Sequence, residues 1–265
     1  MSEPSKTAVI TGGAGGLGRA MTAQLRGQGW KVVITDRPSA ELDRLSPGPE
    51  LEIRPCDLTD RAERDATLAA IAAEHPSIDL AVYNAGITQV GPFESQDEDA
   101  HRKVFEVNYF AAVACAKAFL APVRRAQGVH LAISSAAGFM PLFQRTSYAA
   151  SKHALEGFFK SLRSEEKRYG VATVIAAPSF VATNMGNAER EESGIARPGA
   201  AKDGVDYMSP EEAARIILAA AAARRPFAPV GRVSRLSWLI GRLSPAMMQR
   251  LMERNIDGAA HTDGK

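Results

Sequence analysis

Cysteine is scarce in this sequence. Cys56 and Cys115 are the only two among 265 residues, and neither belongs to a CxxC pair. They cannot supply a disulfide framework, and their scarcity is typical of the reducing cytoplasm, which is the location we expect.

Long apolar runs are missing as well. The run at 216–223 has eight residues, whereas a membrane-spanning helix needs about 20. The first residues, 1–12, lack the apolar centre of a secretory signal peptide. We therefore expect neither a transmembrane segment nor a secretory leader.

Neither sign of charge dominates. The 32 lysines and arginines against 30 aspartates and glutamates leave a net charge of +2, which is too even for strong attraction to nucleic acid. Hydrophobic residues make up 45% and charged residues 23%, which excludes a disordered chain or a coiled-coil rod. The five histidines show no metal-binding spacing, so no metal is expected.

What the sequence does contain is an alternation of short β-branched runs and longer helical patterns. This order predicts an α/β fold, a Rossmann-like, doubly wound parallel sheet with helices on both faces. With no linker or repeat, residues 1–265 are expected to form a single domain. The expected strands are Thr7–Thr11, Lys31–Thr35, Leu51–Cys56, Leu80–Tyr83, Val129–Ser134 and Val171–Ala176, and the expected helices lie near 17–28, 60–74, 97–120 and 148–169.

The alternation is expected to stop after the sixth strand. Residues 186–208 are polar and rich in glycine, and they predict a mobile substrate loop. Ser209, Pro210 and Glu212 have the N-cap, N1 and N3 pattern of a helix start, which predicts a helix to about residue 225. An amphipathic, helical C-terminal extension, 230–265, follows.

A glycine-rich run, Thr11–Gly18, comes directly after the first expected strand and opens the first helix. Glycines there let the backbone approach a pyrophosphate, which the N–H groups and dipole of the new helix stabilise. Asp36 ends the second strand, where a carboxylate binds adenosine ribose hydroxyls and repels a 2′-phosphate. The plainer interpretation of an isolated Asp is a helix N-cap or turn residue. Its neighbour Arg37 could instead hold the 2′-phosphate of NADP.

Tyr148 and Lys152 are four residues apart at the start of a helix, so their side chains share one face. A nearby ammonium favours the phenolate and lowers the tyrosine pKa. The pair alone is weak, because a surface tyrosine over a lysine stem gives the same pattern. Ser135 ends the fifth strand at the edge where open α/β sheets bind ligands. Ser134 is the alternative if the strand register differs by one residue.

Together these motifs resemble the short-chain dehydrogenase/reductase family over residues 6 to about 185. The glycine spacing is TGxxxGxG, and Ser135 stands thirteen residues before Tyr148, as the family's catalytic serine does. The resemblance implies that Ser135, Tyr148, Lys152 and Asn108 are catalytic, Asn108 through a helix kink that holds water near Lys152. Ser179 departs from the family's PGxVxT segment, where glycine is usual.

The resemblance also implies a set of cofactor-binding residues and favours NAD, with NADP possible because of Arg37. Gly15 stands where many NADP-preferring relatives carry a basic residue. The set comprises Gly12, Gly15, Gly16, Leu17, Gly18, Asp36, Arg37, Asp57, Leu58, Asn84, Ala85, Gly86, Tyr148, Lys152, Pro178, Val181 and Thr183.

The function implied is an oxidoreductase that interconverts a secondary alcohol and a ketone on a small-molecule substrate. A 3-oxoacyl carrier-protein reductase is an alternative, although such relatives commonly end in a short strand where this chain continues into a basic tail. A non-catalytic dinucleotide sensor or scaffold is another. Phe158, Phe159 and Leu162 predict core packing first and a subunit interface second, and the family implies a homodimer or homotetramer.

The C-terminal extension allows three interpretations. Leu236, Leu239, Ile240 and Leu243 have amphipathic helical spacing, and eight basic residues against three acidic ones follow residue 223. Packing against the domain or a sister subunit is the plainest interpretation. The others are closure of an apolar substrate pocket, which implies a mid-sized or bulky substrate, and weak contact with an anionic membrane surface.

Overall fold

A computed structural model describes residues 5–183, 195–196 and 207–260, and it describes side chains for 5–183 and 207–253. Its strands include the six expected from the sequence, within two residues at each end. The strands are β1 (Thr7–Thr11), β2 (Lys31–Asp36), β3 (Leu51–Pro55), β4 (Leu80–Tyr83), β5 (Thr88–Gln89), β6 (Val129–Ile133), β7 (Ala172–Pro178), β8 (Ile195–Ala196) and β9 (Phe227–Val230).

The expected helices are present as well, and the helix expected after Ser209 begins with the cap that the sequence predicts. Ser209 accepts a hydrogen bond from the Glu212 amide at 3.1 Å at the start of one helix, and Asp60 caps another. The helices are α1 (Gly16–Gly27), α2 (Ala40–Asp43), α3 (Arg61–Glu74), α4 (Glu98–Phe105), α5 (Ala111–Ala126), α6 (Thr146–Glu166), α7 (Pro210–Ala222), α8 (Arg232–Leu243) and α9 (Pro245–Ala260).

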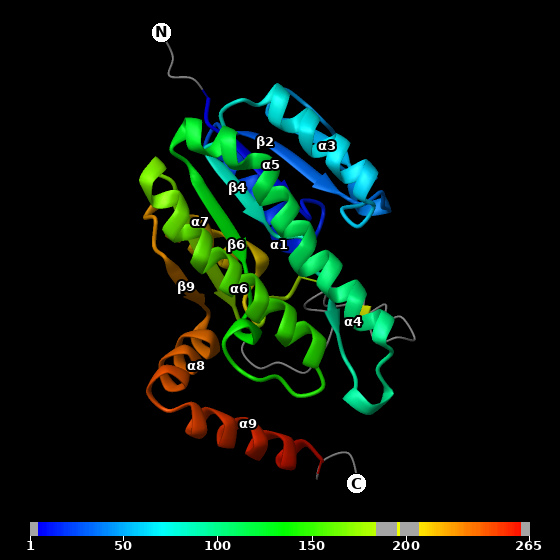
Figure 1. The fold of residues 1–265 in the computed structure, drawn as a ribbon, viewed down its shortest axis with the longest axis vertical. Helices are drawn as coiled ribbons and strands as arrows, with labels where there is room; N and C mark the ends of the chain where they lie inside the picture. Colours follow the sequence, from blue (N-terminus) through cyan, green and yellow to red (C-terminus); the bar gives the residue numbers. More distant parts are fainter. Residues whose placement is uncertain (1–4, 184–194, 197–206, 261–265) are drawn as a thin grey trace.

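Seven strands form one parallel sheet in the order β3-β2-β1-β4-β6-β7-β9 (Figure 1). Alternate residues of each strand point to opposite faces, and each face is covered by helices. Val9, Val33 and Ala81 lie in the cluster with α3, α5 and α6, whereas Ala8 and Val32 lie in the cluster with α1 and α7. The fold is therefore the expected doubly wound α/β architecture.

The chain reverses its direction of progress across the sheet at β1. Its strand neighbours are β2 on one side and β4 on the other. The loops after these strands diverge above the carboxyl edge, and such a switch point leaves a crevice for a ligand. The glycine run after β1 and Asn84 after β4 both lie at this edge.

The expectation that the alternation stops after the sixth strand is wrong. β9 pairs in parallel with β7 and extends the sheet by one edge strand. It was missed because it has only four residues and contains Pro229, which lacks the N–H that a central strand would use. Of the expected loop 186–208, Ile195–Ala196 pairs antiparallel with Thr88–Gln89, and Met208 bridges to Val181. The rest of this loop lies outside the described residues.

The C-terminal extension is helical, and Figure 1 shows α8 and α9 beyond the end of the sheet. The side of the extension that packs against the domain differs from the apolar face that the sequence predicts. Ile240 and Met248 pack with Met140, but Leu239 and Leu243 are exposed. Periodicity alone could not show which side of the helix meets the domain.

One helical stretch, Glu98–Ala126, is long and apolar enough to cross a membrane by length and composition. The expectation of no such segment rested on unbroken apolar runs, which this stretch lacks. Its residues Cys115, Phe119 and Val123 pack in the core beneath the sheet, and the core helix of a globular domain meets the same criterion. Both cysteines are buried and unpaired.

Candidate active site

The glycine run after β1 is close-packed at most of its positions. Gly12 has φ +67°, and a Cβ there would lie 2.8 Å from Ala85 Cα. A Cβ at Gly18 would lie 2.2 Å from Gly12 O, and one at Gly16 would lie 2.8 Å from Thr183 O. Gly15 differs, since its Cβ would meet only Gly12 O at 3.6 Å. The turn thus needs glycine at these sites but has room for a side chain at Gly15.

The turn Asn84–Gly86 braces this run. Asn84 Nδ2 donates hydrogen bonds to the carbonyls of Thr11 (3.1 Å) and Gly12 (2.9 Å). The amides of Asn84 and Ala85 both donate to Thr11 Oγ1. The turn therefore supports the loop from the neighbouring strand, and α1 begins at Gly16, where its first N–H groups have no partners within the helix.

The Asp36 carboxylate lies beside the glycine run. It accepts hydrogen bonds from the Ala14 amide at 3.0 Å and the Arg37 amide at 2.9 Å. The helix cap after it is supplied by Ser39 instead, so the N-cap interpretation of Asp36 is wrong. Arg37 is exposed. This carboxylate is placed at the end of β2 where a ribose would be bound.

Asp57 and Leu58 follow β3 at the same edge of the sheet. Asp57 is exposed and accepts hydrogen bonds from the amide and hydroxyl of Thr59, while Leu58 is buried. Their arrangement fixes the turn into α3.

Ser135 and Tyr148 are brought together, which resolves the register. The Ser135 hydroxyl forms a hydrogen bond with the Tyr148 side chain and accepts one from the Ala137 amide at 3.2 Å. The neighbouring Ser134 points elsewhere and donates to Glu156 at 2.9 Å. Because successive strand residues face opposite ways, only Ser135 reaches the tyrosine.

Tyr148 and Lys152 lie one turn apart in the buried first half of α6. Burial raises the pKa of Tyr148, while the hydrogen bond with Ser135 and the charge of Arg145 lower it. Lys152 Nζ donates to the carbonyl of Ile133 at 2.9 Å and lies 5.8 Å from the Tyr148 ring centroid. Burial lowers the pKa of Lys152 to about 8. An ammonium here changes its charge near neutral pH.

Asn108 lies in a π-helical turn, Glu106–Phe110, between α4 and α5. Such turns widen a helix locally and are frequent at functional sites. Asn108 Nδ2 donates to Ile87 O and Ser151 Oγ, and its Oδ1 accepts from the Ile87 amide. A Cβ at Gly86 would lie 3.3 Å from Asn108 Oδ1 and 3.6 Å from Lys152 Nζ. The expected helix distortion is therefore present beside the lysine.

The segment after β7, with Pro178, Val181 and Thr183, closes the crevice against the glycine run. Ser179, which replaces the usual glycine, donates its hydroxyl to Val230 O at 3.3 Å. The neighbouring Gly231 has φ +92°, and a Cβ there would lie 2.3 Å from Ser179 Oγ. The serine is accommodated because the residue facing it is a glycine.

Sequence reasoning missed Arg145 and Glu156. Arg145 precedes Tyr148 by three residues and donates to Thr88 Oγ1 at 3.1 Å. Glu156 is buried one turn after Lys152 and forms an ion pair with Lys160 at 2.7 Å. The signal for both was their helical spacing from the tyrosine and the lysine.

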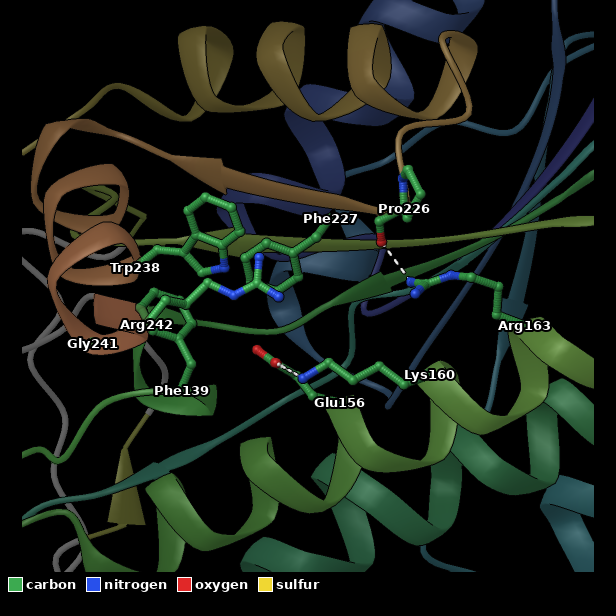
Figure 2. Close-up of a pocket in the computed structure, with 9 residues that line it drawn as sticks. All are labelled: Phe139, Glu156, Lys160, Arg163, Pro226, Phe227, Trp238, Gly241 and Arg242. Atoms are coloured by element: carbon green, nitrogen blue, oxygen red, sulfur yellow. Dashed lines mark hydrogen bonds and ion pairs between the residues drawn. The ribbon is translucent and has the colours of Figure 1, made fainter. Parts of the chain in front are cut away.

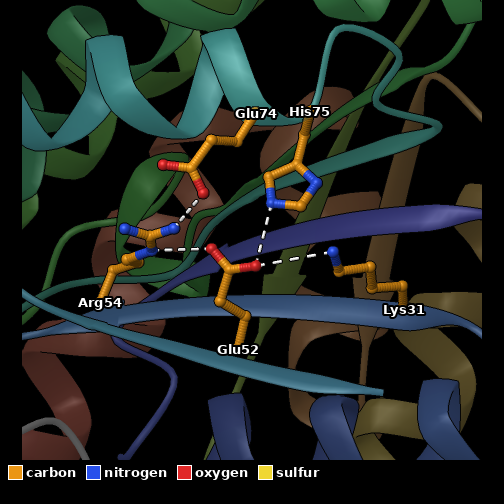
Figure 3. A network of polar contacts seen from close by, with 5 residues as sticks. All are labelled: Lys31, Glu52, Arg54, Glu74 and His75. Atoms are coloured by element: carbon orange, nitrogen blue, oxygen red, sulfur yellow. Dashed lines mark hydrogen bonds and ion pairs between the residues drawn. The ribbon is translucent and has the colours of Figure 1, made fainter. Parts of the chain in front are cut away.

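A second polar cluster lies far from these residues, between β3 and the end of α3 (Figure 3). Glu52, Glu74 and His75 come close enough together to suggest a metal site. However, Glu52 pairs with Arg54 at 2.7 Å and with Lys31 at 3.6 Å, and Arg54 also pairs with Glu74. Burial raises the pKa of Glu52, but Arg54 and His75 lower it overall. Two cations already neutralise the carboxylates, which is the arrangement of a structural ion-pair network.

Comparison with known proteins gives a consistent match. Residues 6–194 match the family described as short chain dehydrogenase. The cattle (Bos taurus) protein "Dehydrogenase/reductase SDR family member 7B" is 35% identical over 67% of this chain and 58% of its own length. The chain therefore spans little more than half of that relative. A Drosophila melanogaster "Dehydrogenase/reductase SDR family protein 7-like" is 28% identical over 95% of this chain and 80% of its own.

Solved structures are similar along nearly the whole chain. A short-chain dehydrogenase from Streptomyces avermitilis superimposes with a TM-score of 0.79 and 26% identity, covering 97% of this chain and all of that one. One from Burkholderia cenocepacia, in complex with NADP, gives a TM-score of 0.80 and 22% identity, covering 95% and 99%. At 22% identity, the similarity to the Burkholderia cenocepacia structure is evidence for the fold alone.

Proposed function

Because this chain belongs to the short-chain dehydrogenase family, we propose that it interconverts a secondary alcohol and a ketone by hydride transfer. The observation that carries the proposal is one constellation at the carboxyl edge of the sheet. Ser135 is hydrogen-bonded to Tyr148, and Lys152 lies one helical turn further along α6. A non-catalytic dinucleotide sensor would have no need for these three groups together.

The residues divide the proton chemistry among them. In reduction, the Tyr148 hydroxyl donates its proton to the substrate carbonyl oxygen as the carbon accepts a hydride, and in oxidation it takes the proton back. Ser135 donates a hydrogen bond to the same oxygen and fixes its position. The Lys152 ammonium stabilises the phenolate, and Asn108 supports the relay of protons beside it. Such general acid–base assistance contributes roughly 100- to 10,000-fold in rate.

The crevice has the features that a nicotinamide dinucleotide requires. Gly12 and Gly16 let the turn pack closely against Ala85 and Thr183, and the N–H groups at the start of α1 would hold a pyrophosphate. Asp36 would bind the adenosine ribose, and Lys152 the nicotinamide ribose. When bound, the dinucleotide supplies or accepts the hydride.

NAD is the cofactor we propose, with NADP as the alternative. Asp36 would repel a 2′-phosphate, and Gly15 offers no cation to bind one. Exposed Arg37 favours NADP. The Burkholderia cenocepacia structure was determined with NADP, which supports a nicotinamide dinucleotide in general.

The substrate we propose is mid-sized or bulky and apolar. Met140 and Leu142, shortly after Ser135 in the chain, pack with Ile240, Met248 and Met252 of the extension. Flexible methionines adapt to irregular apolar ligands. This packing supports the view that α8 and α9 cover an apolar wall near the reacting oxygen.

A homo-oligomer in the cytoplasm completes the proposal. Phe159 and Leu162 are buried in the core, but Phe158 is only half-buried and packs against Tyr109, beside exposed Phe110. These rings leave an apolar surface across two helices that a second copy can cover. Sedimentation of the purified chain tests this, and a monomer at micromolar concentration would contradict it.

The test of the function is dinucleotide oxidation with NADH and NADPH across a panel of aldehydes, cyclic ketones, steroid ketones and 3-oxoacyl thioesters. We expect cyclic or steroid ketones to be the best substrates. Highest turnover on 3-oxoacyl thioesters would instead establish the carrier-protein reductase, whose expected final strand is present here as β9. Tight dinucleotide binding without turnover on any carbonyl would establish the sensor.

A further inference from the structure

A cavity of about 440 Å³ lies between α6, β9 and α8 (Figure 2). Its α6 wall consists of Glu156, Lys160 and Arg163. Lys160, which lines it, follows Tyr148 by twelve residues, about 18 Å along a helix. Glu156, described above one turn after Lys152, lines this cavity, but Ser135, Tyr148 and Lys152 do not.

One wall of the cavity is aromatic. The rings of Phe227 and Trp238 stack with their centroids 5.7 Å apart and an interplanar angle of 16°. Phe139 meets Phe227 edge-on at 5.8 Å. Flat rings prefer such offset or edge contacts, so this wall offers a surface for another flat apolar body.

The polar lining is mainly cationic. The Arg242 guanidinium stacks 4.7 Å from the Trp238 centroid, and Lys160 Nζ lies 5.9 Å from that of Phe227. Arg242 makes no ion pair with any other described residue. Arg163 is satisfied by the carbonyls of Thr173 and Pro226.

Among the described residues, one carboxylate lines the cavity, and it is already engaged. Glu156 accepts hydrogen bonds from Lys160 at 2.7 Å and from Ser134 at 2.9 Å. Figure 2 shows this pair projecting from α6 toward the aromatic wall. An anion entering the cavity therefore meets cations whose charge is only partly compensated.

From this arrangement we infer that the cavity is a second ligand site, which binds a small molecule with a flat apolar body and a single anionic group. The apolar body lies against the wall formed by Phe139, Phe227 and Trp238, and the carboxylate or sulfonate pairs with Arg242. Occupancy of this site needs neither cofactor nor turnover.

The test is fluorescence titration of the full chain with 8-anilinonaphthalene-1-sulfonate, an aromatic sulfonate. We expect one saturable site, and about tenfold weaker binding in Arg242→Gln, in line with the loss of one charge-assisted contact. Arg235→Gln is the matched control, because Arg235 is on the same helix, is exposed and does not line the cavity. It should bind like the natural chain. Thermal unfolding checks that both variants are folded.

A neutral analogue, N-phenyl-1-naphthylamine, separates the charge from the aromatic wall. Its affinity should be the same in Arg242→Gln as in the natural chain. If Arg235→Gln and Arg242→Gln weaken binding of the sulfonate equally, the inference is overturned. The absence of a saturable site would also overturn it. Loss of binding in Leu239→Ser would place the dye on the exposed leucines of α8 instead. Affinity that falls as the protein concentration rises would mean that a second copy covers the cavity.

Discussion

Burial lowers the pKa of Lys152 to about 8, and the carboxylate of Glu156, one helical turn further along α6, acts against this shift by raising it. Glu156 is itself held between Ser134 and Lys160. The charge state of the proposed catalytic lysine near neutral pH therefore depends on a side chain that touches neither the tyrosine nor the crevice.

Replacing Glu156 by Gln should lower the pKa of Lys152 further, because it removes the charge that raises it. The ammonium is then lost at a lower pH, so the alkaline fall of ketone reduction should move down by up to about one pH unit. The measurement is kcat/KM against pH. Ser134→Ala, which removes a hydrogen bond to Glu156 but leaves its charge, should keep the natural profile. If the alkaline fall of kcat/KM lies at the same pH in Glu156→Gln as in the natural chain, the charge of Glu156 does not act on Lys152.

Tyr148→Phe should reduce kcat at least about 100-fold, because only the hydroxyl that exchanges the proton is removed. Dinucleotide affinity, measured by fluorescence titration, should stay within about threefold. Tyr169→Phe, in the turn after α6, should leave both unchanged. Substantial turnover in Tyr148→Phe would mean that another group carries the proton.

Gly15→Arg should move the cofactor preference toward NADP. The natural chain should favour NAD by about tenfold in kcat/KM, because Asp36 repels a 2′-phosphate. Gly15 has room for a side chain, so an arginine there can bind that phosphate without distorting the turn. Gly16→Arg is the contrasting variant and should weaken both cofactors, since its Cβ would meet Thr183. Equal use of NAD and NADP by the natural chain would show that Arg37 outweighs Asp36.

His130 should make the protein less stable in acid. Burial lowers the pKa of His130 to about 4, while the unfolded chain has a histidine pKa near ~6.5. The unfolded state therefore binds a proton that the native state does not, so stability is full above about pH 6.5 and declines as the pH falls toward 4. The expected loss is about 2 kcal/mol between pH 7.5 and 5.

Urea unfolding at several pH values measures this loss. In His130→Gln the loss of unfolding free energy between pH 7.5 and 5 should be smaller by most of the expected ~2 kcal/mol. This variant keeps a polar group beside the Tyr83 hydroxyl, which contacts His130 at 2.6 Å. An identical pH dependence of stability in the two proteins would show that His130 does not cause the loss in acid.

Removing residues 244–265 should raise KM for bulky ketones several-fold and leave dinucleotide affinity unchanged. The deletion takes away Met248, which packs on Ala136 and Met140 just after Ser135, but keeps Ser234, whose hydroxyl anchors α8 to Ala177 O. Steady-state kinetics with small and large ketones is the measurement. Unchanged KM for every large ketone would contradict a pocket-closing role, and loss of an oligomer would identify an interface.

The amino-acid sequence by itself determined the local features of this protein. Strand and helix positions follow from apolar periodicity, the start of α7 from its capping residues, and the tight turn after β1 from its glycines. These are short-range effects, decided by backbone geometry and neighbouring side chains. Ser135, Tyr148 and Lys152 could be selected because two of them share one helix and the third ends a strand at the predicted carboxyl edge.

Only the tertiary structure decided the rest. It chose Ser135 over Ser134, because the partner of each serine lies on α6, more than ten residues away in the chain. It added β9, whose pairing depends on β7 and not on its own weak pattern, and it turned Leu239 and Leu243 outward because packing against Met140 takes the other side of the extension. Glu156 and the aromatic cavity likewise required segments far apart in the sequence to meet, and no local pattern records such contacts.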